Sequence, residues 1–454
     1  MAPAGRGTWG TRAGFILAAS GSAVGLGNIW GFPTQVGQGG GAAFVVVYLA
    51  CIALICGPIL IAELAIGRRA QKDPVTAFAT IRPGTLWWLT GVLGVLAGVG
   101  ILSFYSVVAG WTLAYVWFSI SGAVHPAQEL GSFFGNFVSN APLTIGLTIL
   151  VLAISAAVVM AGVRSGIERF TKALMPLLVV LLVLLAIRGL TLPGAAAGLA
   201  YYLRPDFSRV LDIAVFNAAL GQAFFSLSLG MGTMITYGSY LSRREGIAGA
   251  ALWVIALDTT IALLAGLIIF PTGFSLPGFD PATGGPGLIF TVLPRLFATL
   301  PAGAFIGGAF FVLLAVAALT SAISLLEVPV AHLIDGHGWP RRHAVLAVTV
   351  ATAALAVPSA LGNGAVGFFT QLPGVGMNFL TLMATIWNNF ALPIGGLLVA
   401  LFVGYAWRAE GAIAELQAEG AWLPYPRLWA FLVRYVSPVG IAIIIVFTFR
   451  ALIG

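Results

Sequence analysis

The stretch Ser20-Gly-Ser-Ala-Val-Gly-Leu-Gly-Asn-Ile-Trp-Gly-Phe-Pro33 interrupts an otherwise apolar segment with glycines and small polar residues. Lipid cannot solvate free backbone groups, so a break in a membrane helix persists only where its N–H and C=O groups face protein, ions or a solute. We therefore interpret this stretch as half of a binding site inside a membrane protein.

The composition excludes a water-soluble globular domain, because 60% of the 454 residues are hydrophobic, 8% are charged and the mean hydropathy is +1.04. Cys51 and Cys56 lie in one apolar run and suggest core residues, not a metal site or a disulfide framework. The four histidines are scattered, which argues against a metal centre. A sensor would need a soluble output domain and an enzyme a catalytic cluster, and the sequence shows neither.

Eleven apolar runs are long enough to cross a bilayer in one transmembrane domain, 1–454. They lie near 12–36, 41–66, 87–120, 142–161, 166–187, 213–240, 247–273, 303–335, 341–357, 366–406 and 429–451. If the N-terminus is cytoplasmic, only five of the 21 basic residues lie outside: Arg188, Arg204, Arg209, Arg295 and Arg450. This asymmetry predicts a cytoplasmic N-terminus and, with an odd number of spans, an external C-terminus. It also explains the net charge of +7 without a nucleic-acid partner. Arg6 and Arg12 precede the first run without a small-residue cleavage site, so we expect a retained span and no signal peptide.

A second break, Ser226-Leu-Ser-Leu-Gly-Met-Gly232, falls in the middle of the sixth run, five helices after the first. Matching interruptions are typical of an inverted repeat that holds a solute at the midplane. The repeats would be 12–187 and 213–406, with the helix at 429–451 outside them. A glycine-rich packing face could explain either break alone, but two breaks in register with polar side chains favour a site.

The sequence resembles the neurotransmitter:sodium symporter family, and in particular the bacterial LeuT-like amino acid transporters. The resemblance runs from Trp9 to about Tyr405. It rests on these pieces: Trp9-Gly-Thr-Arg12, Gly21-Ser-Ala-Val-Gly-Leu-Gly-Asn28, Phe32-Pro33, Gly39-Gly-Gly41, Tyr48, Glu63, Gly67-Arg68, Tyr105, Gly110-Trp111-Thr112-Leu113, Gly221-Gln-Ala-Phe-Phe-Ser-Leu-Ser-Leu-Gly230, Thr236-Tyr-Gly-Ser-Tyr240 and Ala317-Ala-Leu-Thr-Ser321. It implies an all-α LeuT fold of eleven transmembrane helices with broken helices 1 and 6, in the inner membrane of a bacterium.

The resemblance also implies two Na⁺ sites, and an unwound turn supplies the oxygen ligands that this ion needs without adding protein charge. The first site would use the Ala23 carbonyl, Asn28, Ser226 and Asp258. The second would use the carbonyls of Gly21, Val24 and Ala317 and the hydroxyls of Thr320 and Ser321. The alternative for these two hydroxyls is a hydrogen bond to a carbonyl of their own helix.

By the same resemblance, the solute would bind between the two breaks. A carboxylate would lie against the N–H groups of Leu26 and Gly27, with the Tyr105 hydroxyl as a further donor. The remaining contacts would come from Ser22, Ala23, Gly25, Ile101, Phe225, Ser226, Ser228, Met231, Ser321 and Leu325. Monoamine-carrying relatives place an aspartate where this chain has Gly25, so an amino acid with its own carboxylate fits better. The pliable Met231 leaves the side-chain preference open, and we favour neutral, apolar side chains.

Asp258 is an acid near the centre of a membrane helix, which makes it a functional candidate. Some relatives have asparagine there and need chloride to balance sodium, so a fixed carboxylate predicts chloride independence. Ala262, one turn on, also lacks the hydroxyl that chloride-dependent members offer. The alternative is a protonated Asp258 bonded to Gln222 or Tyr48. Two further intramembrane acids are expected to brace the broken helices: Glu63 and Glu327.

The resemblance places a cytoplasmic gate at Arg6, Trp9, Tyr240 and Asp335, with an Arg–Asp pair backed by an aromatic ring and a phenol. The outer charge pair of the family is replaced by Gly31 and Ala384, so outer closure would rest on Tyr105 and Phe225 or on a residue that the sequence does not identify.

The sequence thus predicts a sodium-coupled symporter that imports a small neutral amino acid by alternating access and is not an enzyme. A carrier of a betaine, sulfonate or amine is the alternative. The partners expected are this solute and the lipid bilayer. Sodium stoichiometry, oligomeric state and proton counter-transport stay open.

Overall fold

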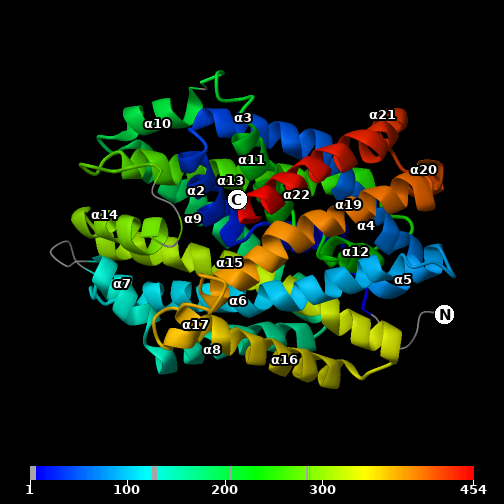
Figure 1. Ribbon diagram of the computed structural model, residues 1–454, viewed down its shortest axis with the longest axis horizontal. Helices are drawn as coiled ribbons and strands as arrows, with labels where there is room; N and C mark the ends of the chain where they lie inside the picture. Colours follow the sequence, from blue (N-terminus) through cyan, green and yellow to red (C-terminus); the bar gives the residue numbers. More distant parts are fainter. Residues whose placement is uncertain (1–6, 125–129, 205, 283–284, 286, 454) are drawn as a thin grey trace.

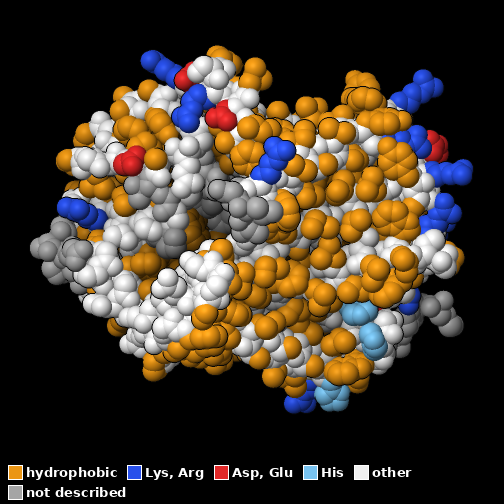
Figure 2. All heavy atoms as spheres, in the orientation of Figure 1, with side chains coloured by type: hydrophobic (Ala, Val, Ile, Leu, Met, Phe, Trp, Pro, Cys, Tyr) orange, Lys and Arg blue, Asp and Glu red, His pale blue; other side chains and the backbone are white. Residues whose placement is uncertain are grey.

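The computed structural model describes residues 7–124, 130–204, 206–282, 285 and 287–453, with the side chains of 451–453 left out. Most helices run along the long axis of the molecule, and no strand occurs in these ranges (Figure 1). Figure 2 shows apolar side chains over the middle of one face, with Lys and Arg gathered mainly toward its ends. This distribution suits a bundle that crosses a membrane along its long axis.

The first half of the chain forms α1 (Arg12–Ala23), η1 (Gly27–Gly31), α2 (Phe32–Gln38), α3 (Ala42–Cys51), η2 (Ile52–Cys56), α4 (Gly57–Ala70), α5 (Pro74–Ile81), α6 (Trp88–Ile120), α7 (Leu130–Val138), α8 (Ala141–Met160), η3 (Val163–Glu168), α9 (Arg169–Leu190) and α10 (Ala195–Leu203). The second half begins with α11 (Ile213–Ser226), α12 (Thr233–Ser239), α13 (Ile247–Gly273), η4 (Leu288–Val292), α14 (Leu293–Thr299), α15 (Gly303–His337) and α16 (Arg341–Leu361). It ends with α17 (Gly367–Thr370), α18 (Phe379–Ala384), η5 (Thr385–Ala391), α19 (Leu392–Leu401), η6 (Phe402–Ala406), α20 (Ala409–Leu416), η7 (Ala418–Gly420), α21 (Pro426–Phe431), η8 (Leu432–Val436) and α22 (Ser437–Ile453).

Within the described residues, nine continuous helices are long and apolar enough to cross a membrane, and the bent pair Arg12–Ala23 and Gly27–Gln38 makes a tenth. The expected span at 213–240 consists of two pieces, α11 and α12, each too short to cross alone. The count of eleven spans and the inverted repeat therefore stay predictions. The expected span 366–406 is wrong at its start, because the membrane helix covers Phe379–Ala406. Pro373 and the left-handed Gly374 and Gly376 end helical structure before it.

Both expected breaks are present. α1 ends at Ala23, Val24 is extended, and the chain resumes at Gly27 with a 50° bend between the two halves. Between α11 and α12, Gly230 and Gly232 have φ of 78° and 75°, a left-handed conformation that glycine adopts without steric cost. Each break is therefore made by residues that favour leaving the helix.

Helices far apart in sequence hold the second break in place. Glu63 of α4 accepts a hydrogen bond from the Gly230 N–H at 2.8 Å, so this acid braces a broken helix as expected. Next to it, α4 and α12 touch through their backbones: a Cβ on Gly67 would lie 2.0 Å from the Ile235 carbonyl oxygen. The long helices α6 and α15 pack along each other and complete the centre of the bundle.

Candidate functional site

The two breaks enclose a central cavity that gathers most of the predicted solute site. Its lining is Ser22, Ala23, Gly25, Gly27, Ile101, Tyr105, Phe225, Ser228, Met231, Ser321 and Leu325. Of the predicted residues, only Leu26 and Ser226 lie outside this lining, and both are bonded to residues beside it. The free space is about 20 Å³, little more than the roughly 10–15 Å³ that one water molecule needs. Any larger solute therefore requires the lining side chains to move apart.

One wall of the cavity is the unwound backbone of the first break. The Leu26 N–H donates a hydrogen bond to the Tyr105 hydroxyl at 3.2 Å. Gly25 faces α15 so closely that a Cβ there would lie 2.5 Å from Ser321 Oγ and 2.8 Å from Tyr105 Oη. A side chain at position 25 would therefore fill the place where a solute could reach these groups.

The Ser22 carbonyl joins the two breaks. It accepts hydrogen bonds from the Ser228 hydroxyl at 2.9 Å and from the Ser321 hydroxyl at 3.1 Å. Ser321 also lies 3.3 Å from the Val24 carbonyl oxygen. Carbonyls at the end of α1 are thus satisfied by hydroxyls from the second break and from α15, as a break inside lipid requires.

Beside the cavity, Asn28, Ser226 and Asp258 form a closed polar cluster. The Asn28 amide nitrogen donates to Asp258 Oδ1 at 2.7 Å, and the Ser226 hydroxyl lies 2.9 Å from both carboxylate oxygens. Asp258 is fully buried, and it forms no ion pair with a described Lys, Arg or His. The alternative partners expected for this acid are wrong: Gln222 donates to the Gly27 carbonyl and Tyr48 to Ser226. A charged carboxylate here is held by neutral donors alone, and it is costly to bury without a cation.

A second oxygen-rich place lies where α15 meets the first break. The Thr320 hydroxyl donates to the Ala317 carbonyl at 2.9 Å, which is the bond within its own helix expected as the alternative. Ser321 instead points to the first break. Gly21 packs against Thr320, since a Cβ on Gly21 would lie 3.4 Å from Thr320 Cβ. The two hydroxyls of the predicted second set thus lie beside two of its three carbonyls, those of Ala317 and Val24.

Both places fit Na⁺ by their chemistry, because they offer oxygen atoms of carbonyls, hydroxyls and, in one case, a carboxylate. Among the described ion pairs, no Lys, Arg or His side chain occupies either place of a bound cation. The Asn28 side-chain oxygen accepts from the Gly25 N–H at 3.1 Å while its nitrogen faces Asp258. Ligation of Na⁺ by Asn28 therefore requires its amide to turn.

The family model described as the Sodium:neurotransmitter symporter family matches residues 6–130 and 135–453. This chain belongs to that family. A sodium-dependent transporter of Bacillus subtilis, YhdH, is 36% identical over 442 residues, which cover 97% of this chain and 96% of that protein. The sodium-dependent dopamine transporter of Bos taurus is 28% identical over 97% of this chain and 68% of its own length. The crystal structure of MhsT in complex with L-phenylalanine matches with a TM-score of 0.90 and 47% identity, over 97% of this chain and 99% of MhsT.

Membership of this symporter family makes the protein a multi-pass membrane transporter with sodium coupling and a LeuT-like fold, not an enzyme.

At the expected cytoplasmic end of the symporter, Trp9 donates its indole N–H to the Tyr237 carbonyl at 3.0 Å and packs edge-on against Tyr240. The Tyr240 hydroxyl donates to Glu327 at 2.7 Å, and Glu327 pairs with Arg341 at 2.5 Å. Glu327 thus ties the end of α12, one half of the second broken helix, to α16, whereas Glu63 bonds the break itself. Asp335 accepts a hydrogen bond from the Asp73 N–H at 2.8 Å, and Arg6 lies outside the described residues.

Sequence reasoning missed the clamp that Glu168 places on the N-terminal segment. Its carboxylate accepts hydrogen bonds from the Gly10 N–H at 2.6 Å and the Thr11 hydroxyl at 3.1 Å, and it pairs with Lys172 at 2.5 Å. The spacing of Glu168 and Lys172, four residues apart on one helical face, was the available signal. Nothing local in the sequence points to Gly10, 158 residues away.

Phe225 also lines a second, open cleft of about 410 Å³ beside the cavity. The polar part of this cleft is mostly amide: Gln35, Asn217, Gln222, Asn388 and Asn389. Gln222 packs against Gly31, where a Cβ would lie 3.0 Å from its side-chain oxygen. Neutral amides therefore occupy the region beside Gly31, and the ring of Phe225 borders both spaces.

Proposed function

We propose that this protein imports a small neutral amino acid with an apolar side chain together with Na⁺, by alternating access. The observation that carries the proposal is the buried Asp258 carboxylate, bonded only to neutral groups, beside a break whose backbone lines the central cavity. A cation bound there would balance a charge that the chain leaves uncompensated.

The proposed first Na⁺ site consists of the Ala23 carbonyl, Asn28, Ser226 and Asp258. The second consists of the Gly21, Val24 and Ala317 carbonyls with Thr320 and Ser321. Atoms of Asn28, Ser226 and Asp258 lie 2.7 to 2.9 Å apart, and the Thr320 and Ser321 hydroxyls lie 2.9 and 3.3 Å from the Ala317 and Val24 carbonyls. These distances support both sets, because a small turn of each hydroxyl or amide would present several oxygens to one ion. Bound Na⁺ supplies positive charge at the midplane, and two such sites would couple the first break to α13 and to α15.

The proposed solute places its carboxylate between the Leu26 N–H and the Tyr105 hydroxyl, which are bonded to each other at 3.2 Å. The carboxylate would accept a hydrogen bond from both groups, and the space in front of Gly25 admits it. Ile101, Met231 and Leu325 supply an apolar wall for the solute side chain. The phenylalanine in the MhsT complex, at 47% identity, supports this class of solute.

We further propose that transport needs no chloride. Asp258 would carry the compensating charge permanently, and the fully buried Ala262 offers no hydroxyl for an anion. The gating residues proposed are Phe225 and Tyr105 on the outside and Trp9, Tyr240, Asp335 and Arg6 on the cytoplasmic side. The inverted repeat would comprise 12–187 and 213–406, with the N-terminus in the cytoplasm of a bacterium and the C-terminus outside.

A thermal-shift measurement on the purified protein tests the function. L-Phenylalanine or L-leucine at about 100 times its Kd should raise the free energy of unfolding by about 2.7 kcal/mol in NaCl, and far less in KCl. Gly25→Ala should abolish this shift, because its Cβ would crowd Ser321 and Tyr105. Gly221→Ala is the matched control, since its Cβ would meet no atom within 4 Å.

Stabilisation of equal size in potassium would contradict sodium coupling. A shift produced by a betaine, a sulfonate or an amine but by no amino acid would replace the proposed solute with the alternative class.

A further inference from the structure

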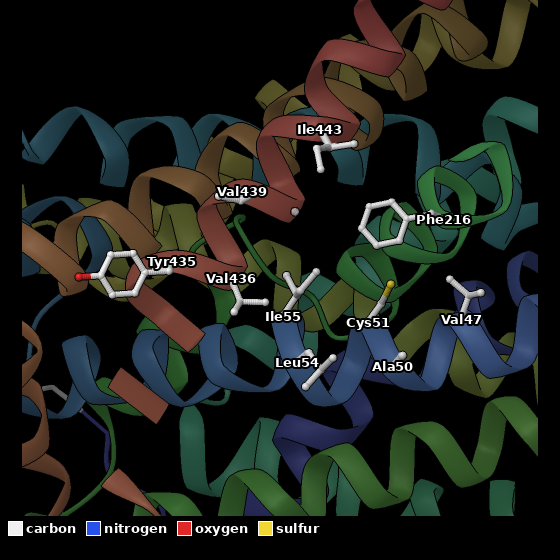
Figure 3. Close-up of a pocket in the computed structure, with 11 residues that line it drawn as sticks. Val47, Ala50, Cys51, Leu54, Ile55, Phe216, Tyr435, Val436, Val439 and Ile443 are labelled. Atoms are coloured by element: carbon white, nitrogen blue, oxygen red, sulfur yellow. The ribbon is translucent and has the colours of Figure 1, made fainter. Parts of the chain in front are cut away.

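An apolar groove opens on the side of the bundle between α3 and η2, the start of α11, and the final helix. Figure 3 shows its side chains around an open space below α22. Its volume is about 470 Å³, and its lining is Val47, Ala50, Cys51, Leu54, Ile55, Phe216, Tyr435, Val436, Val439, Gly440 and Ile443. Gly440 lets α22 approach η2, because a Cβ there would lie 2.6 Å from Ile55 Cδ1. The two helices touch at this point, and a hollow remains between them beside the contact.

The groove continues along α22 into a second hollow of about 440 Å³. The two hollows share Val439 and Ile443, and the second extends to Ile213 and Arg450. From Tyr435 to Arg450 the helix advances about 22 Å at 1.5 Å per residue. One leaflet of a bilayer, with its headgroups, is about 20–22 Å thick, half of the roughly 40–45 Å of the whole. The length of the groove therefore matches one phospholipid and not the whole membrane.

Arg450 gives the groove a charged end. It lies exposed in the last turn of α22, and it pairs with no carboxylate among the described residues. A guanidinium group matches the geometry of a phosphate diester and can donate two hydrogen bonds to it. A cation at one end of an apolar channel is complementary to an anionic headgroup with its acyl chain.

We propose that this groove binds one anionic phospholipid, with its phosphate on Arg450 and an acyl chain along α22 over Cys51 and Gly440. Exposed apolar side chains cover other helices as well, yet here two connected hollows end at a cation that pairs with no carboxylate in the described part of the chain. The site is separate from the solute cavity and does not depend on which solute is carried. Phe216 links it to α11, the helix that ends at Ser226 in the sodium cluster.

Native mass spectrometry of the full chain in detergent, titrated with phosphatidylglycerol or phosphatidylcholine of identical acyl chains, tests the proposal. We expect one phosphatidylglycerol to bind about fivefold more tightly than phosphatidylcholine. A basic residue near a membrane surface contributes about 1 kcal/mol to the attraction of anionic lipids, and this free energy corresponds to that factor. Arg450→Gln should remove this preference, and Arg450→Lys should keep most of it. Ala50→Phe should weaken the binding of both lipids, because its ring fills the groove.

Two variants serve as matched controls. Arg188→Gln removes another arginine from the last turn of a membrane helix, α9, and Ala153→Phe adds a ring to an exposed position of α8. Both should bind lipid like the parent. Equal binding of the two lipids by the parent, or an unchanged preference in Arg450→Gln, overturns the proposal. Lipid-free dimers that Ala50→Phe dissociates would assign the groove to a second copy of the chain instead.

Discussion

Tyr240→Phe should open the side of the transporter that we propose to face the cytoplasm. The substitution removes one hydroxyl, which donates to the buried Glu327 carboxylate at 2.7 Å and so connects α12 to α15. A hydrogen bond to a charged group contributes about 1.5–3 kcal/mol. If this bond forms only while the inner side is closed, its loss raises the ratio of inward-open to inward-closed molecules by roughly 10- to 150-fold.

The assay is the labelling rate of a single cysteine on the inner pathway. Ala331→Cys places it on α15, one turn beyond Glu327, at a position only 2% exposed in this structure. The two native cysteines are replaced by alanine. Labelling by a membrane-impermeant maleimide should then accelerate in Tyr240→Phe by a factor within that range, and Na⁺ with solute should change the rate.

Tyr237→Phe is the matched control, because it removes a hydroxyl one turn earlier whose acceptor, Ser324, is neutral. Its effect should be smaller, in line with the roughly 0.5–1.5 kcal/mol of a neutral hydrogen bond. Unchanged labelling in Tyr240→Phe, or an equal increase in both variants, would refute the reasoning that the bond to Glu327 holds the inner side closed.

Three further predictions concern the ions and the N-terminal clamp. Thr320→Ala with Ser321→Ala should abolish the stimulation of solute binding by Na⁺ in a radioligand assay, and a double variant that still responds to Na⁺ would exclude the proposed second site. Uptake into proteoliposomes by the parent should survive replacement of chloride by gluconate. Uptake by the double variant Asp258→Ser, Ala262→Ser should instead rise with added chloride. If this variant is inactive at every chloride concentration, chloride cannot replace the charge of the carboxylate. Glu168→Ala should lower the thermal midpoint and speed proteolysis of the N-terminal segment, because the buried acceptor of Gly10 and Thr11 is lost; an unchanged midpoint and proteolysis rate would show that the clamp is not stabilising.

The two helix breaks could be predicted from the sequence because their signals are local, whereas the lining of the cavity was predicted from the resemblance to the symporter family. Glycine and serine in a membrane span mark the place where the helix ends, and the structure has breaks at both such places, after Ala23 and after Ser226. The start of the helix at Phe379 was also signalled locally, by Pro373 and Gly374, but the long apolar run around them concealed it.

Contacts across the fold could not be predicted in the same way. Thr320 and Ser321 are adjacent hydroxyls with the same chemistry, yet one bonds its own helix and the other the first break. Which of them turns inward depends on how α15 is rotated against α1, and that rotation is set by packing of the whole bundle. The same holds for Gln222, which bonds the Gly27 carbonyl and not Asp258, the partner that the alternative interpretation gave it.

The two serine hydroxyls bonded to the Ser22 carbonyl affect how easily the solute leaves the site. Ser228 and Ser321 already satisfy this carbonyl. If the ammonium group of the proposed amino acid binds there, it replaces one of these hydrogen bonds and does not add to them. The net free energy of such an exchange is small, about 1 kcal/mol per bond or less. We therefore expect the backbone at the break to contribute more to orienting the solute than to retaining it. The serine hydroxyls can bond the carbonyl again as the solute leaves. Dissociation then leaves no unsatisfied carbonyl behind, which favours a fast dissociation step.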